Sequence, residues 1–139
     1  MRCRSLAALS AAALMALVPV GAGAAVSPGT GVIGTWVNPK GSVKVQTGGC
    51  GDKLCGWVVW ANPQATADAH EAGVDKLIGV ALLQDYRATG PGRWQGRVYV
   101  PDLGKTYYST IRQLDANSLK ISGCILGGWI CKSQTWQRG

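Results

Sequence analysis

The sequence predicts an all-β chain that forms an eight-stranded antiparallel up-and-down barrel, with at most one short helix in residues 62–76. Three observations favour this class. Short segments rich in β-branched and aromatic residues recur at fairly even spacing, turn residues separate them, and strands do not alternate with helices. We expect the sheet to close, because closure removes the exposed edges that an open sheet would leave.

The first 24 residues have the three parts of a secretory signal peptide. Arg2 and Arg4 precede an apolar run from Leu6 to Val20, and Ala22-Gly23-Ala24 matches the small-x-small pattern of a cleavage site. The apolar run is shorter than the ~20 residues that span a bilayer, which disfavours a membrane anchor. We therefore expect a periplasmic or secreted protein that contacts the membrane only through its cleaved signal.

Cleavage would leave residues 25–31 as a flexible leader and residues 32–139 as a single β-barrel domain. This mature chain would carry twelve basic and seven acidic residues, a formal net charge of +5, because Arg2 and Arg4 are removed. Its charges are scattered singly and form no run. We therefore expect a solvated surface and no nucleic-acid binding.

The expected strands follow one another with a turn between each pair. They cover residues 33–37, 42–47, 54–61, 77–86, 93–100, 105–114, 118–124 and 129–138. In the long connection, residues 65–72 can form a short helix that ends at Gly73. The third strand is apolar on both faces, with Trp57 and Val59 on one and Val58 and Trp60 on the other. Such a strand must be covered twice, or one face must meet a ligand or partner.

Four cysteines, Cys50, Cys55, Cys124 and Cys131, would remain after Cys3 leaves with the signal. An even number in a small exported domain favours disulfides over the alternative, a four-cysteine metal site. In an up-and-down barrel the first two flank a turn at one end and the last two flank a connection at the other. Strands hold those ends about 17–20 Å apart. We therefore predict the local disulfides Cys50–Cys55 and Cys124–Cys131 and no bound metal.

Two sets of residues resemble known families. Gly34-x-Trp36 on the first strand, with Arg138 at the end of the last, resembles the lipocalin signature, in which the tryptophan packs under the arginine. The chain also resembles the bacterial family called domain of unknown function 2147 (DUF2147). The motifs that carry this second resemblance are Gly34-x-Trp36, Leu54-Cys55-Gly56, Gly92-x-Trp94-x-Gly96-x-Val98-Tyr99-x-Pro101, Gly104-Lys105-Thr106-Tyr107, Leu119-Lys120-Ile121-x-Gly123-Cys124 and Gln134-Thr135-Trp136-x-Arg138.

These resemblances imply an exported, lipocalin-like (calycin-type) barrel and no established activity. We accordingly assign Gly34, Trp36, Trp136 and Arg138 to structure.

No catalytic mechanism can be named from the sequence. The single histidine, His70, lies in the long connection and is expected to be solvated, which leaves a Ser-His-Asp site without support. The carboxylates all lie in or beside expected turns. A phosphate-binding loop leads directly into a helix, but no helix is expected after the glycine-rich residues 47–51. The interpretation favoured here is a non-enzymatic protein without a cofactor.

Binding is better supported, because a small barrel can hold one small-molecule ligand at its open mouth. Aromatic side chains with one cation suit an amphipathic or carboxylate-bearing ligand. The candidate ligand-binding residues are Trp57, Trp60, Trp94, Tyr107, Tyr108 and Arg112. Two alternatives stay open: these tryptophans fill a solid core, or the protein is a cell-envelope protein–protein interaction module. The sequence leaves the oligomeric state open.

Overall fold

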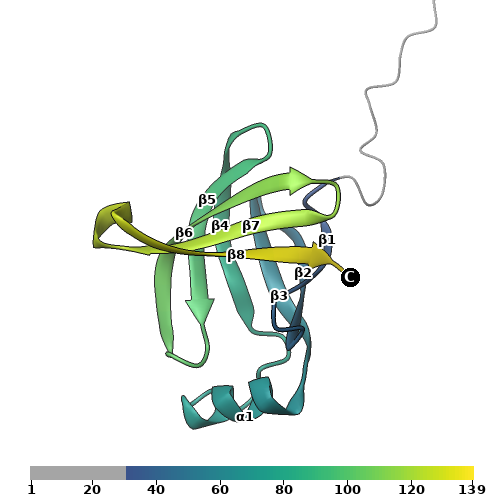
Figure 1. The fold of residues 1–139 in the computed structure, drawn as a ribbon, viewed down its shortest axis with the longest axis vertical. Helices are drawn as coiled ribbons and strands as arrows, with labels where there is room; N and C mark the ends of the chain where they lie inside the picture. The colour runs from purple at the N-terminus through teal and green to yellow at the C-terminus, as the bar shows by residue number, and fades with distance from the viewer. Residues whose placement is uncertain (1–30) are drawn as a thin grey trace, which may run out of the picture.

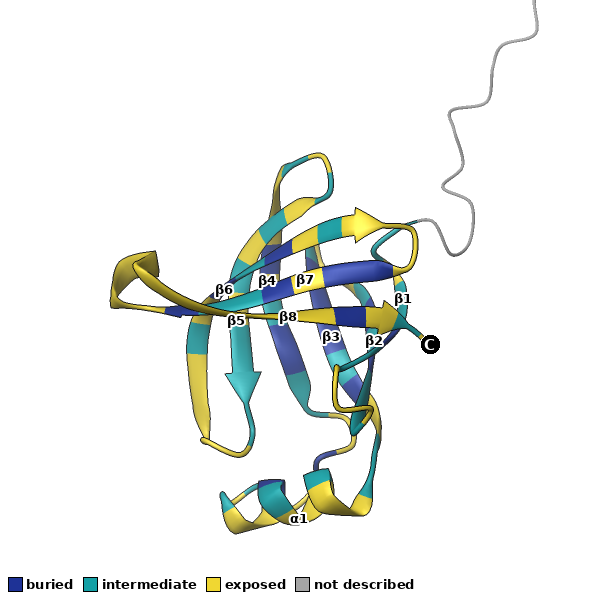
Figure 2. Cartoon of the chain, in the orientation of Figure 1, coloured by how far each residue is buried: buried dark blue, intermediate teal, exposed yellow. Residues whose placement is uncertain are grey.

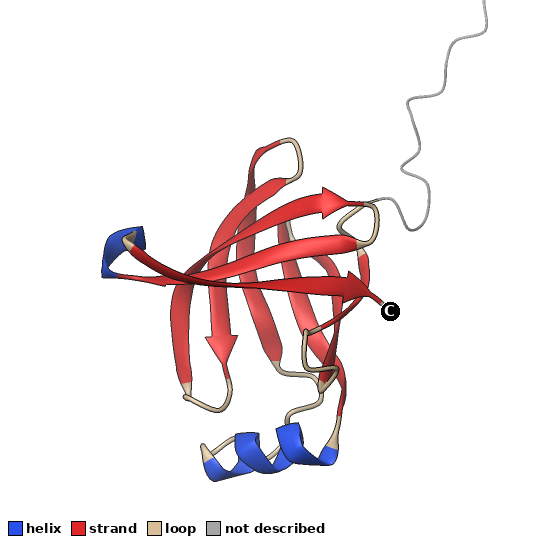
Figure 3. Ribbon diagram, in the orientation of Figure 1, coloured by secondary structure: helices blue, strands red, loops and turns tan. Residues whose placement is uncertain are grey.

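The computed structural model describes residues 31–139, which form eight strands and one α-helix (Figure 1). The expected signal peptide and nearly all of the leader lie outside these residues. The strands are β1 (Gly34–Val37), β2 (Val43–Cys50), β3 (Lys53–Ala61), β4 (Ala81–Gly90), β5 (Arg93–Val100), β6 (Lys105–Asp115), β7 (Ser118–Ile125) and β8 (Ile130–Arg138). Helix α1 (Pro63–Glu71) follows β3, and the 3₁₀ turn η1 (Leu126–Gly128) joins β7 to β8 (Figure 3).

Each strand pairs antiparallel with the next, and β1 pairs with β8 to close the ring. The expected eight-stranded up-and-down barrel is therefore confirmed. Closure is short, because β1 and β8 share only two residue pairs, Trp36 with Arg138 and Val37 with Gln137. Within residues 31–139, no helix has the length and apolar content needed to cross a bilayer.

The helix in residues 62–76 is confirmed, and its sequence explains where it begins. Asn62 is the N-cap, whose Oδ1 accepts a hydrogen bond of 2.8 Å from the Ala65 N–H, and Pro63 takes the first helical position. After the helix, Gly73 has a φ of 91°, a left-handed conformation that glycine adopts without strain.

The expected start of the fourth strand at residue 77 was wrong. Residues 77–80 form a turn in which the Val80 N–H bonds to Leu77 O, and β4 begins only at Ala81. Buried Leu77 joins the core cluster from this turn, because an apolar side chain can reach the core from a turn as well as from a strand. Strand β4 then extends to Gly90, with a register irregularity around Asp85, whose φ is 54°.

Large side chains fill the barrel interior. The core residues with at most 1% of their surface exposed include Trp36, Val45, Val58, Leu83, Tyr86, Ile111 and Leu119. Figure 2 shows this buried layer along the middle of the strands. Ala69 of α1 belongs to the same cluster, so the helix packs over the end of the barrel opposite the termini (Figure 1).

Tyr86 makes a polar contact inside this core. Its hydroxyl donates a 2.7 Å hydrogen bond to Ser109 Oγ, and both residues are fully buried. The ring fits because Gly96 lies beneath it: a Cβ at that position would lie 2.7 Å from Tyr86 Cγ. Burial raises the pKa of the Tyr86 phenol well above its ordinary value, so the phenol stays neutral in the folded protein.

Stability is expected to fall above about pH 10 because of Tyr86. An unfolded tyrosine has a pKa of about 10, and the folded pKa is higher. Above pH 10 the unfolded state therefore binds fewer protons than the folded state, so its free energy falls relative to that of the folded state as pH rises. Tyr86→Phe should lower the free energy of unfolding by about 1–2 kcal/mol at neutral pH, because the Ser109 hydroxyl loses its partner. Between neutral pH and about pH 10.5, however, the variant should lose less stability than wild type.

Urea unfolding near neutral pH and near pH 10.5 tests this expectation. Tyr108→Phe is the control, because it removes a tyrosine hydroxyl from an exposed position. If Tyr86→Phe kept the full alkaline loss of stability, Tyr86 would not be its source.

Candidate functional site

The six candidate ligand-binding residues do not lie together. Residues opposite each other on neighbouring strands share a face of the sheet. Trp94 lies opposite buried Ile111, and Tyr107 lies opposite Val98, which packs against the core. Trp94 and Tyr107 are therefore on the inner face, and both are half-buried.

The other four candidates, Trp57, Trp60, Tyr108 and Arg112, lie on the outer face. The last three are exposed, and Trp60 has 43% of its surface accessible, with the Lys44 ammonium 5.7 Å from its ring centroid. A bulge explains the orientation of Trp60. Val45 pairs with Val58 but Lys44 pairs with Trp60, so Val59 is an extra residue. The expected sharing of a face by Val58 and Trp60 was therefore wrong.

Arg138 covers the end of the barrel that holds the termini. Its guanidinium carbon lies 4.3 Å from the Trp36 ring centroid, and its nitrogens donate to the carbonyls of Gly31, Ile33 and Ala116. A Cβ at Gly34 would overlap the guanidinium, so glycine leaves the space that the arginine occupies. This end of the barrel is closed by protein atoms.

Two surface concavities lie beside α1, outside the ring of strands. One, of about 390 Å³, is lined by Asp68, Glu71, Ala72 and Asp102. The other, of about 580 Å³, is lined by Ala61, Pro63, Thr66, Ala67, His70, Glu71 and Asp75. The first has three carboxylates and no cation in its lining, which does not suit a carboxylate-bearing ligand.

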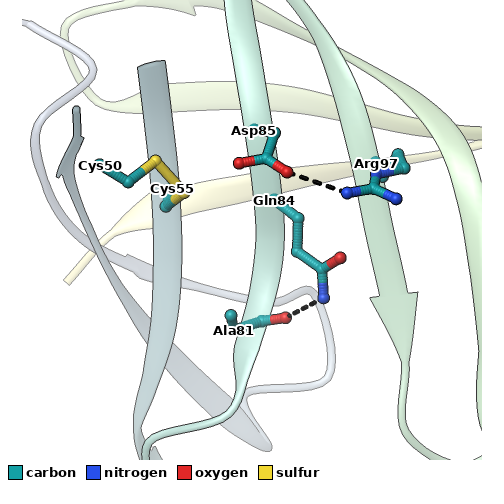
Figure 4. Close-up of polar contacts among 6 residues, drawn as sticks. All are labelled: Cys50, Cys55, Ala81, Gln84, Asp85 and Arg97. Carbon is teal, nitrogen blue, oxygen red and sulfur yellow. Dashed lines mark hydrogen bonds and ion pairs between the residues drawn. A yellow bond between two sulfur atoms is a disulfide. The ribbon is translucent and has the colours of Figure 1, made fainter. Parts of the chain in front are cut away.

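Both expected disulfides, Cys50–Cys55 and Cys124–Cys131, are confirmed. Figure 4 shows the Cys50–Cys55 disulfide beside Asp85, whose carboxylate accepts a 2.9 Å hydrogen bond from the Arg97 guanidinium. The two sulfur atoms and the Asp85 carboxylate lie within 4.8 Å of one another, the spacing of a metal site. Because both sulfurs are in the disulfide, neither is a thiolate that could bind a metal, and only the carboxylate is left as a ligand.

The β7–β8 hairpin carries a surface that the sequence analysis did not find. Ile125, Leu126, Trp129 and Ile130, here called the hairpin tip, are all exposed, and Trp129 has 89% of its surface accessible. The tip extends beyond the barrel (Figures 1 and 2). Disulfide Cys124–Cys131 joins directly opposed residues behind it. The signal that was available is the apolar composition of a connection between two cysteines, where polar residues are usual.

One edge of β8 has no neighbouring strand within residues 31–139, from Ile130 to Thr135. The Gly139 N–H bonds to Thr35 of β1, whereas the Arg138 N–H bonds to Asn117 on the β7 side. The side to which a residue's N–H and C=O groups point alternates along a strand. Odd-numbered residues of β8 therefore point away from β7, so the N–H and C=O groups of Cys131, Ser133 and Thr135 point to the open edge. All three residues are exposed. This edge is a template for another strand.

The comparisons with known proteins agree with the fold. The model of the DUF2147 family, described as an uncharacterized protein conserved in bacteria, matches residues 34–138. The chain is similar to protein HP1028 from Helicobacter pylori, which is described as a lipocalin-family protein. The TM-score is 0.59 at 18% identity, over 78% of this chain and 83% of that chain. None of the curated proteins compared matches this sequence. Because the matched region runs from β1 to β8, the chain belongs to the DUF2147 family of bacterial proteins.

Proposed function

We propose that this protein is an exported, non-enzymatic interaction module of the bacterial cell envelope, which binds an extended segment of a partner protein along its β7–β8 hairpin. One observation carries the proposal: this hairpin exposes both an apolar tip and an unpaired strand edge. The sequence pattern of residues 1–24 supports export, and the two disulfides suit an oxidising compartment.

The tip and the edge supply complementary kinds of binding free energy. An added strand would bond to the N–H and C=O groups of Cys131, Ser133 and Thr135, which gives affinity for any extended backbone. The side chains of the tip, above all Trp129, would supply apolar burial and side-chain selectivity. Disulfide Cys124–Cys131 holds the hairpin in one conformation, which lowers the entropic cost of binding.

The geometry of His70 supports a non-enzymatic role. It is the only histidine of the chain, its side chain is 72% exposed, and its nearest carboxylate, Asp75, lies 3.9 Å away and is also exposed. A general base in a hydrolase triad is oriented by a buried partner and lies beside a nucleophile. His70 has an exposed partner on the surface of α1 and its following loop.

A second candidate function is the binding of a small amphipathic molecule at the end of the barrel beneath α1. The observation that favours it is the position of Tyr107, which is half-buried on the inner face close to the β5–β6 turn, whose Asp102 lines a concavity with Asp68 and Glu71 of α1. Trp94 is also half-buried on the inner face, but it follows the β4–β5 turn at the opposite end of the barrel. A ligand there would have to displace the contacts that α1 makes with the core through Ala69.

Photo-crosslinking in living cells tests the proposed interaction. A photoreactive residue replaces Leu126 in the tip, and in the control it replaces Leu103, an exposed leucine in the β5–β6 turn. We expect a discrete adduct with another protein from position 126 and none from position 103. An adduct with the mass of two copies of this chain would instead indicate self-association and would contradict the proposed partner.

Two substitutions at Ser133 separate strand addition from a simple apolar contact. Ser133→Pro removes an N–H that points to the open edge, whereas Ser133→Ala keeps it; both lose the hydroxyl bond to Ser122. We expect the adduct to persist in Ser133→Ala and to disappear in Ser133→Pro, with both variants folded by circular dichroism. Equal adducts would exclude pairing at this edge. A small molecule retained in native mass spectra, with no adduct, would favour the second candidate.

A further inference from the structure

Three cations form a row across the outer face of β5, β6 and β7. The strand register places Arg93 directly opposite Arg112, and Arg112 directly opposite Lys120. All three residues are exposed. These residues, 27 positions apart from first to last in the sequence, are here called the cation row.

The sequence neighbours of the three cations face the barrel core, which shows that the cation row faces outward. Trp94, Ile111 and Ile121 lie opposite one another and pack in the barrel core. Each is the immediate neighbour in sequence of one member of the cation row. Because successive side chains of a strand point to opposite faces, the three cations point to solvent.

Nothing in the described part of the chain neutralises the cation row. The ion pairs among residues 31–139 are His70–Asp75 and Arg97–Asp85. The acidic residue that follows Arg112 on β6 is Asp115, and its carboxylate accepts the Asn117 N–H at the turn. Like charges directly opposite each other on neighbouring strands are destabilising. An arrangement that costs stability in the free protein is favourable when an anion lies across it.

The surroundings of the row also suit an anion. On the same outer face, the next row along the strands consists of Gln95, Thr110 and Ser122. These residues lie opposite one another and offer amide and hydroxyl donors. Arg87 of β4 lies opposite Gln95 and adds a further exposed cation. The face thus presents charged and neutral donors in two parallel rows.

We propose that the cation row binds a ligand that carries two or more phosphate groups. Neighbouring strands lie about 4.8 Å apart, so the row places three cations over about 10 Å. One phosphate can contact two neighbouring cations, and a second phosphate is needed to reach the third. Arginine favours phosphate because its planar guanidinium donates two parallel hydrogen bonds. This inference is independent of the partner proposed for the β7–β8 hairpin.

Calorimetric titration of the oxidised mature protein at low salt tests the proposal, with tripolyphosphate as the probe. Arg112→Gln removes the central cation, and Lys132→Gln is the matched control, because it removes the same charge from exposed β8, outside the row. We expect Arg112→Gln to weaken binding at least about tenfold and Lys132→Gln at most about threefold. The melting temperature of Arg112→Gln without ligand should equal or exceed that of wild type.

Two further probes identify the source of the phosphates. Inorganic phosphate should bind far more weakly than tripolyphosphate, and equal affinities would overturn a site for several phosphates. Vesicles that contain phosphatidylglycerol test whether the phosphates belong to lipid headgroups. If the protein binds only these vesicles and Arg112→Gln abolishes that binding, the cation row binds phosphates that a membrane supplies. An equal loss in Arg112→Gln and Lys132→Gln, or no binding to any probe, would overturn the proposal.

Discussion

Replacing Trp36 by alanine is expected to lower the free energy of unfolding by about 3–5 kcal/mol. Trp36 has no exposed surface, and its indole N–H donates to Val32 O at 3.0 Å and lies 3.3 Å from Thr47 Oγ1. The Arg138 guanidinium covers its ring. Alanine would leave a cavity on one side and an arginine without its aromatic contact on the other, so packing and cation–π contacts are lost together.

Urea unfolding followed by far-ultraviolet circular dichroism measures this effect without relying on tryptophan fluorescence. Trp129→Ala is the matched control, since it removes the same side chain from a fully solvated position. It should change stability by no more than about 0.5 kcal/mol. Similar losses in the two variants would mean that Trp36 does not hold the closed end of the barrel together.

Gly96→Val is expected to destabilise the protein by about 3 kcal/mol, although valine favours strands. A Cβ at this position would lie 2.7 Å from Gln84 O and 2.8 Å from Tyr86 Cα, and both are backbone atoms. A flexible side chain could turn aside, but a neighbouring strand cannot move without loss of its hydrogen bonds. The variant should also disturb the Tyr86–Ser109 hydrogen bond, because the Tyr86 ring occupies the same space.

The control is Gly90→Val at the end of β4, where a Cβ would meet no atom within 4 Å. Thermal and urea unfolding should place Gly90→Val near wild type and Gly96→Val far below it. A well-tolerated Gly96→Val would show that β4 and β5 separate more easily than their contacts indicate.

The closed meander and the disulfide pairs were predictable because each rests on local patterns. Turn residues between β-rich segments define the strand order, and strand order fixes which cysteines share an end of the barrel. The start of β4 was not predictable from these patterns. Leu77 is apolar and buried, but it packs on the core from a turn, and apolar character alone does not distinguish the two cases.

The candidate surfaces depended on information that the sequence does not display. The orientation of Trp60 is set by a single extra residue in β3, Val59, which shifts the expected alternation by one position. The cation row depends on the register of three strands, since Arg93, Arg112 and Lys120 are neighbours only after pairing. The open edge of β8 depends on how short β1 is.

The short closure between β1 and β8 also orders the folding of the chain. Every other strand pair joins consecutive segments, whereas this one joins opposite ends of the domain; Arg138 bonds to Ile33, 105 positions away. Loop-closure entropy makes such a contact slow to form. While the barrel folds, β1 has no second neighbour until β8 has docked against it. For that interval β1 can accept a foreign strand, so the arrival of Arg138 over Trp36 ends the period in which the unfinished barrel can aggregate.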